Sequence, residues 1–309
     1  FVFGCGEALS RLVGGDGGAP LDSLVMPVQM PGGVKIRSIS AGGHHSLFLT
    51  DTNTLLGCGF NARGQLGLGH TSAVTGVVPL LWQSDQTPSQ ISAGEQHSMV
   101  LTRTGRVFSC GQGDGGSLGL GTREDVSTFR EISALANMEI RMVSAGKGGD
   151  TQNMSAALSS DGEVFVWGVG LLFGPDPQAP RRPLLSPRLL SLGLGLYEGD
   201  VVNKLACGSE RLLLLTRLGM CMCWCAHVVA LPVDSTDVHS AYPPEMSRQS
   251  EDPDMSRVML LHETVIGSAL VHYQLDDTVT DIAAARQHCV LYTAKGVVLA
   301  VNWNADPPL

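Results

Sequence analysis

The chain repeats a short segment at long, nearly regular intervals, and this repeat constrains the fold more than any other feature. Each copy begins with an aliphatic residue, continues through small residues and is followed by an apolar run. A fixed period of tens of residues is typical of chains built from successive copies of one structural unit. The copies begin at Ile39, Ile91, Val143, Leu205 and Ile282, at successive intervals of 52, 52, 62 and 77 residues.

A second apolar segment follows each copy after a short turn. Glycine stands in these turns at Gly105, Gly162 and Gly296. Glycine readily adopts the positive φ that tight hairpin turns require. Each repeat is therefore predicted to contain a β-hairpin. The second segments lie at 55–59, 107–111, 164–168, 220–225 and 298–303, and the chain also opens on one at 2–6.

A glycine-rich loop and a further short strand complete the unit. The loops 61–69 and 113–121 have equal length and carry glycine at equivalent positions, and a strand candidate at 77–82 follows the first. Three to four short strands per unit, with almost no helical periodicity, are typical of a β-propeller. We predict an all-β chain that is a single propeller over 1–309, with five to six four-stranded blades visible and no separate helical domain.

The stretch from Ile39 to Gly69 reads ISAGGHHSLFLTDTNTLLGCGFNARGQLGLG. It resembles the repeat of the regulator of chromosome condensation family, in which AGxxHS, a hairpin, a strand end in Trp-Gly or Cys-Gly, and GQLGLG recur. The likeness is close over 34–121 and weaker over 138–192. Over 197–309 it is limited to the order of the repeat segments. The resemblance implies about seven blades, so either the ring is smaller here or, as we expect, the domain is incomplete at one or both ends. The polar stretch within 226–271 is predicted to be an insertion in a blade.

Charge and hydropathy exclude several classes of partner. The formal net charge is −9 and no Lys/Arg run exceeds Arg181-Arg182. A phosphate-backbone binder carries clustered basic residues, so no direct nucleic-acid contact is expected. The apolar stretch 218–233 is too short to span a bilayer, so no membrane span is expected either. The first residue is Phe1 rather than Met, so targeting cannot be read from this sequence.

The repeat accounts for two small motifs that would otherwise suggest a chemical function. Gly111, Gly113 and Gly116 match the dinucleotide-binding pattern GxGxxG, but no helix is predicted to follow them, and the loop after Gly59 is equivalent. We predict a blade loop and no cofactor. The cysteines recur at one repeat position (Cys5, Cys58, Cys110) or alternate along one strand (Cys221, Cys223, Cys225), so we expect core thiols, no metal and, weakly, a reducing compartment.

Histidine followed by Ser or Cys recurs in three repeats and suggests a nucleophile with its base. Neighbours on a strand point to opposite faces, so such a pair cannot share a hydrogen bond. We therefore predict that these histidines are hydrogen-bonded within the blade core and that the loop glycine before each of them is also structural. No catalytic residue is predicted. The predicted structural residues are Gly42, His45, Gly94, His97, Gly146, Gly208 and His288.

The two positions between the loop glycine and the histidine differ from repeat to repeat, whereas the residues that flank them recur. They are expected to lie on one face of the ring, where variable residues suit partner recognition. The candidate partner-binding residues are His44, Glu95, Gln96, Lys147, Asp150, Glu210, Arg286 and Gln287. In the family's exchange factor for the small GTPase Ran, acidic and histidine residues at such positions meet the GTPase. The resemblance thus implies His44, Glu95 and Asp150, although solvated loop tips are the alternative interpretation.

Three functions remain open from the sequence. The first is a non-enzymatic protein-interaction propeller, a scaffold or subunit of a larger assembly. The second is a guanine-nucleotide exchange factor for a Ran-like GTPase, although no insertion in the glycine-rich loops suggests a wedge. The third is chromatin association by family analogy, which the acidic balance opposes.

Overall fold

The computed structural model describes residues 2–4, 26–28, 30–148, 153–168, 183–190, 200–209, 211–219, 221–225, 258–261, 278–285 and 288–302. Within these residues the regular elements are β-strands, apart from two 3₁₀ turns at Pro31–Gly33 and Ser133–Leu135. Four sheets have four strands, one has three and one has two, and all the pairings are antiparallel. In the described part of the chain, no helix is long and apolar enough to cross a membrane.

Each four-stranded sheet is one sequence repeat. The first contains β3 (Ile36–Ala41), β4 (His45–Thr50), β5 (Leu55–Gly59) and β6 (Val74–Pro79). The second contains β7 (Pro88–Ala93), β8 (His97–Thr102), β9 (Val107–Gly111) and β10 (Val126–Glu131). The third contains β11 (Ile140–Ala145), β12 (Met154–Ser159), β13 (Val164–Gly168) and β14 (Leu184–Leu189). The fourth contains β15 (Val202–Cys207), β16 (Arg211–Thr216), β17 (Cys221–Cys225) and β18 (Val258–Leu261).

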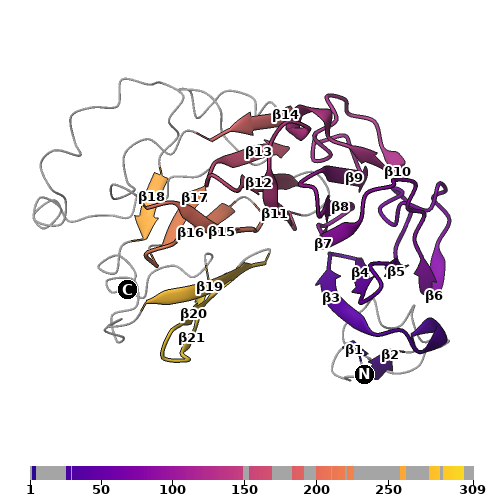
Figure 1. The fold of residues 1–309 in the computed structure, drawn as a ribbon, viewed down its shortest axis with the longest axis horizontal. Helices are drawn as coiled ribbons and strands as arrows, with labels where there is room; N and C mark the ends of the chain where they lie inside the picture. The colour runs from indigo at the N-terminus through magenta and orange to yellow at the C-terminus, as the bar shows by residue number, and fades with distance from the viewer. Residues whose placement is uncertain are drawn as a thin grey trace, which may run out of the picture.

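The sheets follow one another around an arc, with the first strand of each on the inside (Figure 1). The last sheet contains β19 (Val279–Ala284), β20 (His288–Thr293) and β21 (Val298–Asn302), and β1 (Val2–Gly4) pairs with β2 (Met26–Val28) near the N-terminus. Successive inner strands contact each other from β3 through β7, β11 and β15 to β19. This is the blade arrangement of a propeller, as predicted. We number the four-stranded sheets blades 1 to 4 and the three-stranded sheet blade 5.

The predicted hairpins are confirmed, and one strand boundary is corrected. The turn glycines Gly105, Gly162 and Gly296 have φ values of 78°, 88° and 84°. The fourth strand of blade 1 is Val74–Pro79 rather than 77–82, because its pairing with β5 begins opposite Gly59 and ends opposite Leu56. The strand β18 lies inside the stretch 226–271, where it pairs with β17 as the outer strand of blade 4.

The core lies between blades rather than inside a single sheet. Leu47 and Leu49 of β4 are almost fully buried and pack with Ile91 and Ala93 of the next inner strand. Their equivalents in blade 2 pack in the same way on β11. Because alternate residues of a strand face opposite sides, every middle strand contributes apolar residues to two junctions. This explains the low content of charged residues, which is 16%.

The recurring serine of the inner strand joins neighbouring blades. Ser40 Oγ accepts a hydrogen bond of 2.9 Å from the backbone N–H of Ala93, in the next blade. Ser92 and Ser144 accept from Ala145 and Cys207 at the same distance. Ala206 replaces the serine in blade 4, so its junction with blade 5 cannot form this link.

The prediction of core thiols holds for the cysteines whose side chains the structure describes. Cys58, Cys110, Cys207, Cys221 and Cys289 are buried thiols that form no disulfide. Burial raises the pKa of Cys58 to about 11 and of Cys207 and Cys221 to about 12, so these thiols stay protonated at neutral pH. Cys5 lies outside the described residues, as do the side chains of Cys223 and Cys225.

Candidate functional site

The strand connections divide the propeller into two faces. The loop face carries the turns between first and second strands at 42–44 and 94–96, residues 146–148 and 153 of the next such connection, and the loops 60–73 and 112–125 between third and fourth strands. The hairpin-turn face carries the turns between second and third strands at 51–54, 103–106, 160–163, 217–219 and 294–297. The variable positions between loop glycine and histidine therefore lie on the loop face, wherever the structure describes them.

The backbone of these turns forms a chain of hydrogen bonds from blade to blade. The N–H of Gly43 donates to the carbonyl oxygen of Gly94 at 3.0 Å, and the N–H of Glu95 donates to Gly146 at 3.0 Å. The N–H of Lys147 donates to Gly208 at 3.2 Å. The residue after each of these three loop glycines is thus held by the next blade, which fixes the backbone of the candidates Glu95 and Lys147.

The recurring histidines form a second link between blades, as the predicted structural role requires. His45 Nε2 lies 2.8 Å from Ser98 Oγ, which donates its proton to the carbonyl oxygen of Gln65. Ser98 Oγ must therefore accept from His45 Nε2, which sets the histidine tautomer. His97 forms the same link to Ser155 in blade 3 at 2.8 Å. Ser98, which follows His97, thus belongs to the link from the preceding blade.

Both histidines are kept neutral by burial. Burial lowers the pKa of His45 to about 3, with smaller contributions from the charges of His97, His44 and Lys147. Burial also lowers the pKa of His97 to about 4. In each ring Nδ1 is buried without a hydrogen-bond partner and lies against the loop glycine. Neither histidine can therefore take a proton from its following serine, which excludes the nucleophile–base interpretation for these two pairs.

The histidine–serine link is replaced as a unit between blades 3 and 4. Met154 stands at the histidine position of blade 3, and Leu212 stands at the serine position of blade 4. Both side chains are fully buried in the same apolar cluster. Losing one partner alone would leave a buried polar group unsatisfied, whereas replacing both avoids that cost.

Glu95 is the most deeply buried charged residue among the described loop-face candidates. Its side chain is 10% exposed, and Oε1 lies 3.9 Å from Nε2 of His44, which is 51% exposed. A Cβ on Gly43 would lie 2.6 Å and 2.7 Å from the two carboxylate oxygens, so the carboxylate lies directly against that glycine. A side chain at position 43 would therefore displace the Glu95 carboxylate of the neighbouring blade.

Lys147 lies within electrostatic reach of Glu95. Burial lowers the pKa of Lys147, and the negative charge of Glu95 partly offsets this shift. The structure therefore brings His44, Glu95 and Lys147 together across three blades. Gln96 is buried beside them. Asp150, Glu210, Arg286 and Gln287 lie outside the described residues, as does the side chain of His288.

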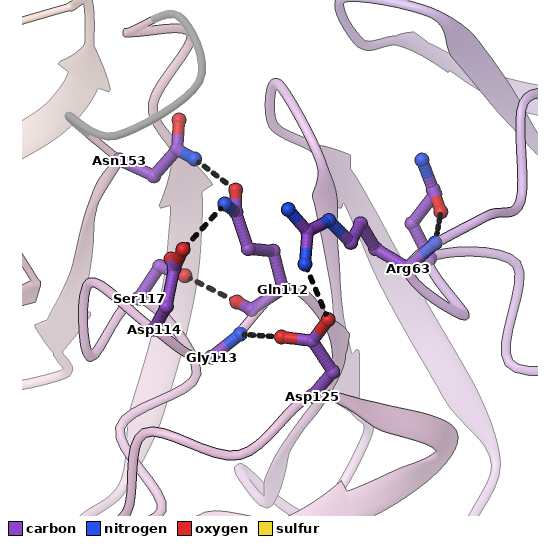
Figure 2. A network of polar contacts seen from close by, with 8 residues as sticks. Arg63, Gln112, Gly113, Asp114, Ser117, Asp125 and Asn153 are labelled. Carbon is purple, nitrogen blue, oxygen red and sulfur yellow. Dashed lines mark hydrogen bonds and ion pairs between the residues drawn. The ribbon is translucent and has the colours of Figure 1, made fainter.

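A second polar network lies on the loop face (Figure 2) and was not predicted from the sequence. Asn153 Nδ2 donates to Gln112 Oε1 at 2.9 Å, and Gln112 Nε2 donates to Asp114 Oδ2 at 3.0 Å. Asn153 and Gln112 are buried, whereas Asp114 is exposed. The network thus joins the loop of blade 2 to the start of β12 in blade 3.

The same loop is joined to blade 1 by an ion pair. Arg63 Nη1 donates to Asp125 Oδ2 at 3.1 Å, and the N–H of Gly113 donates to Asp125 Oδ1 at 2.9 Å (Figure 2). The pairing of residues 62 positions apart could not be read from either repeat alone. The equal length of the two loops was the one signal that pointed to their equivalence.

The GxGxxG stretch is a blade loop, as predicted. Gly111 ends β9 with a φ of 110°, Gly116 has a φ of 74°, and turns rather than a helix follow. A Cβ on Gly113 would collide with the backbone carbonyl of Glu124. These glycines are therefore explained by close packing of backbone within the loop.

We expect Gly113→Ala to destabilise the protein by about 2 kcal/mol, because backbone atoms must move to admit the methyl group. Thermal unfolding followed by circular dichroism measures this. Ala62→Gly, at an exposed position of the equivalent loop, is the control and should change the melting temperature little. Equal melting temperatures for Gly113→Ala and the wild type would contradict the described loop packing.

Two family models match the central part of the chain. Both are described as the regulator of chromosome condensation (RCC1) repeat, and they cover residues 36–65 with 89–116, and 53–101 with 104–149. The chain is 35% identical over 193 residues to mouse (Mus musculus) E3 ubiquitin-protein ligase HERC2, covering 60% of this chain and 4% of the relative. It is 31% identical over 192 residues to the bovine (Bos taurus) secretion-regulating guanine nucleotide exchange factor, covering 61% of this chain and 40% of the relative. The chain thus spans less than half the length of these relatives.

Solved propellers share the fold over most of the chain. Human WBSCR16 superposes with a TM-score of 0.67 at 23% identity, covering 90% of this chain and 65% of that one. Yeast RCC1 (Prp20), solved bound to Kap60, superposes with a TM-score of 0.65 at 17% identity, covering 91% and 60%. The repeat match, the blade topology and these superpositions agree. The chain therefore carries regulator of chromosome condensation repeats over residues 36–149.

Proposed function

We propose that this chain is a non-enzymatic propeller that binds a protein partner through its loop face, as a subunit or scaffold of a larger assembly. The observation that carries the proposal is the placement of His44, Glu95 and Lys147. Blade-to-blade hydrogen bonds fix the backbone of these turns, while the side chains differ from repeat to repeat. A rigid frame that presents non-repeated charged groups favours recognition, because little conformational entropy is lost on binding.

The charges on this face suit a partner with a cationic group. The Glu95 carboxylate is nine-tenths buried, and Nε2 of His44 lies 3.9 Å from its Oε1. A partly desolvated carboxylate without a close donor gains more from a charge-assisted hydrogen bond than an exposed one does. An arginine or lysine of the partner that reaches Glu95 would supply that donor.

We expect Glu95→Gln to weaken capture of the partner at least about tenfold, since a truncated buried charge contact typically costs about 2 kcal/mol or more. Proteins retained by the immobilised full chain are compared by quantitative mass spectrometry between the wild type and the variant. Asp51→Asn, on the hairpin-turn face, is the matched control and should retain the same proteins as the wild type. Equal retention by Glu95→Gln and Asp51→Asn would refute loop-face binding through Glu95.

Nucleotide exchange is the second candidate, favoured by the likeness to the bovine exchange factor. Against it, the glycine-rich loops of blades 1 and 2 fold back onto neighbouring blades, through Gly69 N–H to Ser127 O and Gly121 N–H to Leu185 O, both at 2.8 Å. Neither loop therefore projects as a wedge. Release of fluorescent GDP from a Ran-type GTPase tests this candidate: acceleration at micromolar protein would establish it, and no acceleration with no complex formed would remove it.

A further inference from the structure

On the hairpin-turn face, the inner strand of every blade has the same irregularity in its pairing. All five inner strands have a register shift near this face, between Ile36 and Ser38 in blade 1 and at the equivalent place in the others. Such a bulge leaves one residue outside the regular pairing and redirects its side chain. The five residues at this position are Arg37, Ser89, Arg141, Asn203 and Thr280.

The two bulge arginines each reach toward the next blade. Arg37 Nη2 donates to the carbonyl oxygen of Ser89 at 3.0 Å, and Arg141 Nη2 donates to the carbonyl oxygen of Val202 at 2.9 Å. Both residues are exposed. Each guanidinium carries five N–H donors, so both keep donors for a further ligand.

A second arginine stands in the hairpin turn of the blade that each bulge arginine reaches. The N–H of Arg217 donates to Val201 O, adjacent to the carbonyl that accepts from Arg141. Burial and the positive charge of Arg217 lower the pKa of Arg141, which places the two charges close together. Arg103 is the repeat equivalent of Arg217 and is anchored in the same way, to Thr87 O. Ser89 and Ser160 occupy the equivalent positions at the junction between blades 2 and 3, which therefore carries no such charges.

None of the ion pairs in the described part of the chain involves these four arginines. The ion pairs there involve other residues, such as Arg106 with Glu131 and Lys204 with Asp281. Arg103 Nη2 donates to Asn53 Oδ1 at 3.5 Å, and the Asp200 carboxylate accepts the backbone N–H of Leu218, next to Arg217. Like charges held together without an anion are unfavourable, and an anion that bridges them removes the repulsion. The planar guanidinium also matches the two oxygens of a carboxylate.

We propose that the arginine pairs Arg37–Arg103 and Arg141–Arg217 form a docking surface for an acidic segment of a partner protein. The pairs lie two junctions apart on the inner rim of the hairpin-turn face. A small anion can occupy one pair, whereas a segment with several Asp or Glu residues engages both. The net charge of −9 opposes nucleic acid as the ligand. This surface lies opposite the loop face, so its test is independent of the function proposed above.

The test uses a fluorescein-labelled oligoglutamate peptide and the full chain, with fluorescence anisotropy at low ionic strength. We expect Arg103→Glu/Arg217→Glu to weaken binding at least about tenfold. The fold should be kept, because the backbone anchors remain and the carboxylate introduced at position 217 would face Arg141; the melting temperature checks this. Arg123→Glu, exposed on the loop face, is the matched control with unchanged affinity.

Two outcomes would overturn the proposal. One is an affinity that is unchanged in the double variant or falls equally in Arg123→Glu, since binding would then not depend on these pairs. The other is complete displacement of the peptide by millimolar inorganic phosphate, since the pairs would then take single anions rather than an acidic segment.

Discussion

Gly94→Val should destabilise the protein by about 3 kcal/mol or more, because the new side chain meets two groups that cannot move freely. A Cβ at this position would collide with the ring of His97 and lie 2.7 Å from the carbonyl oxygen of Gly146. That carbonyl accepts the N–H of Glu95, so displacing it also breaks a link between blades 2 and 3. We expect the melting temperature to fall by about 6 °C or more, measured by circular dichroism or scanning calorimetry.

The matched control is Gly43→Val in blade 1. A Cβ there would meet the end of the Glu95 side chain, at 2.5 Å from Cδ, and a flexible side chain can turn away. This variant should lose much less stability than Gly94→Val. Equal melting temperatures for the two variants would contradict the close backbone approach at Gly94. The glycine is required by that approach rather than by a positive φ, which the structure does not show at this position.

Acidification should destabilise the protein through His45 and His97. Their pKa values in the folded state, about 3 and about 4, lie below the value of 6.5 expected when unfolded. The unfolded state therefore binds more protons between these values, so stability falls as the pH falls through 6.5. At about pH 5 each histidine should cost about 2 kcal/mol relative to neutral pH. Urea unfolding from about pH 7.5 to about pH 5 measures the combined loss.

The junction between blades 3 and 4 supplies the test variant. His97→Met/Ser155→Leu copies the Met154–Leu212 pair and removes one of the two buried histidines without leaving its serine unpaired. We expect this variant to lose about half of the acid sensitivity that the two histidines cause. An unchanged dependence of the unfolding free energy on pH would show that His97 does not contribute to it.

The repeat predicted the class of fold because it is local. Hydrophobic alternation, turn glycines and the recurrence of Ile-Ser-Ala-Gly each depend on a few neighbouring residues, so the hairpins and their order could be read directly. The boundary of β6 was misplaced by three residues, since the end of a strand depends on its partner β5. The side-chain placement of Asp150 and Arg286 stays a prediction.

The candidate site was predicted only in part. The variable positions on the loop face could be identified, because the repeat fixes their frame. The pairing of Glu95 with His44 could not, since it joins different blades and depends on the rotation between them. The network of Gln112 with Asn153 and the arginine pairs of the hairpin-turn face were missed for the same reason.

The sequence by itself determined that the chain is a series of β-hairpin units and that its glycines recur in turns and loops. These properties follow from patterns within one repeat. Only the tertiary structure decided what each recurring polar residue binds: Ser40, His45 and Gly94 all find their partners in an adjacent blade. The physical reason is that blades bury their faces against one another, so the residues that satisfy a buried polar group lie about one repeat away.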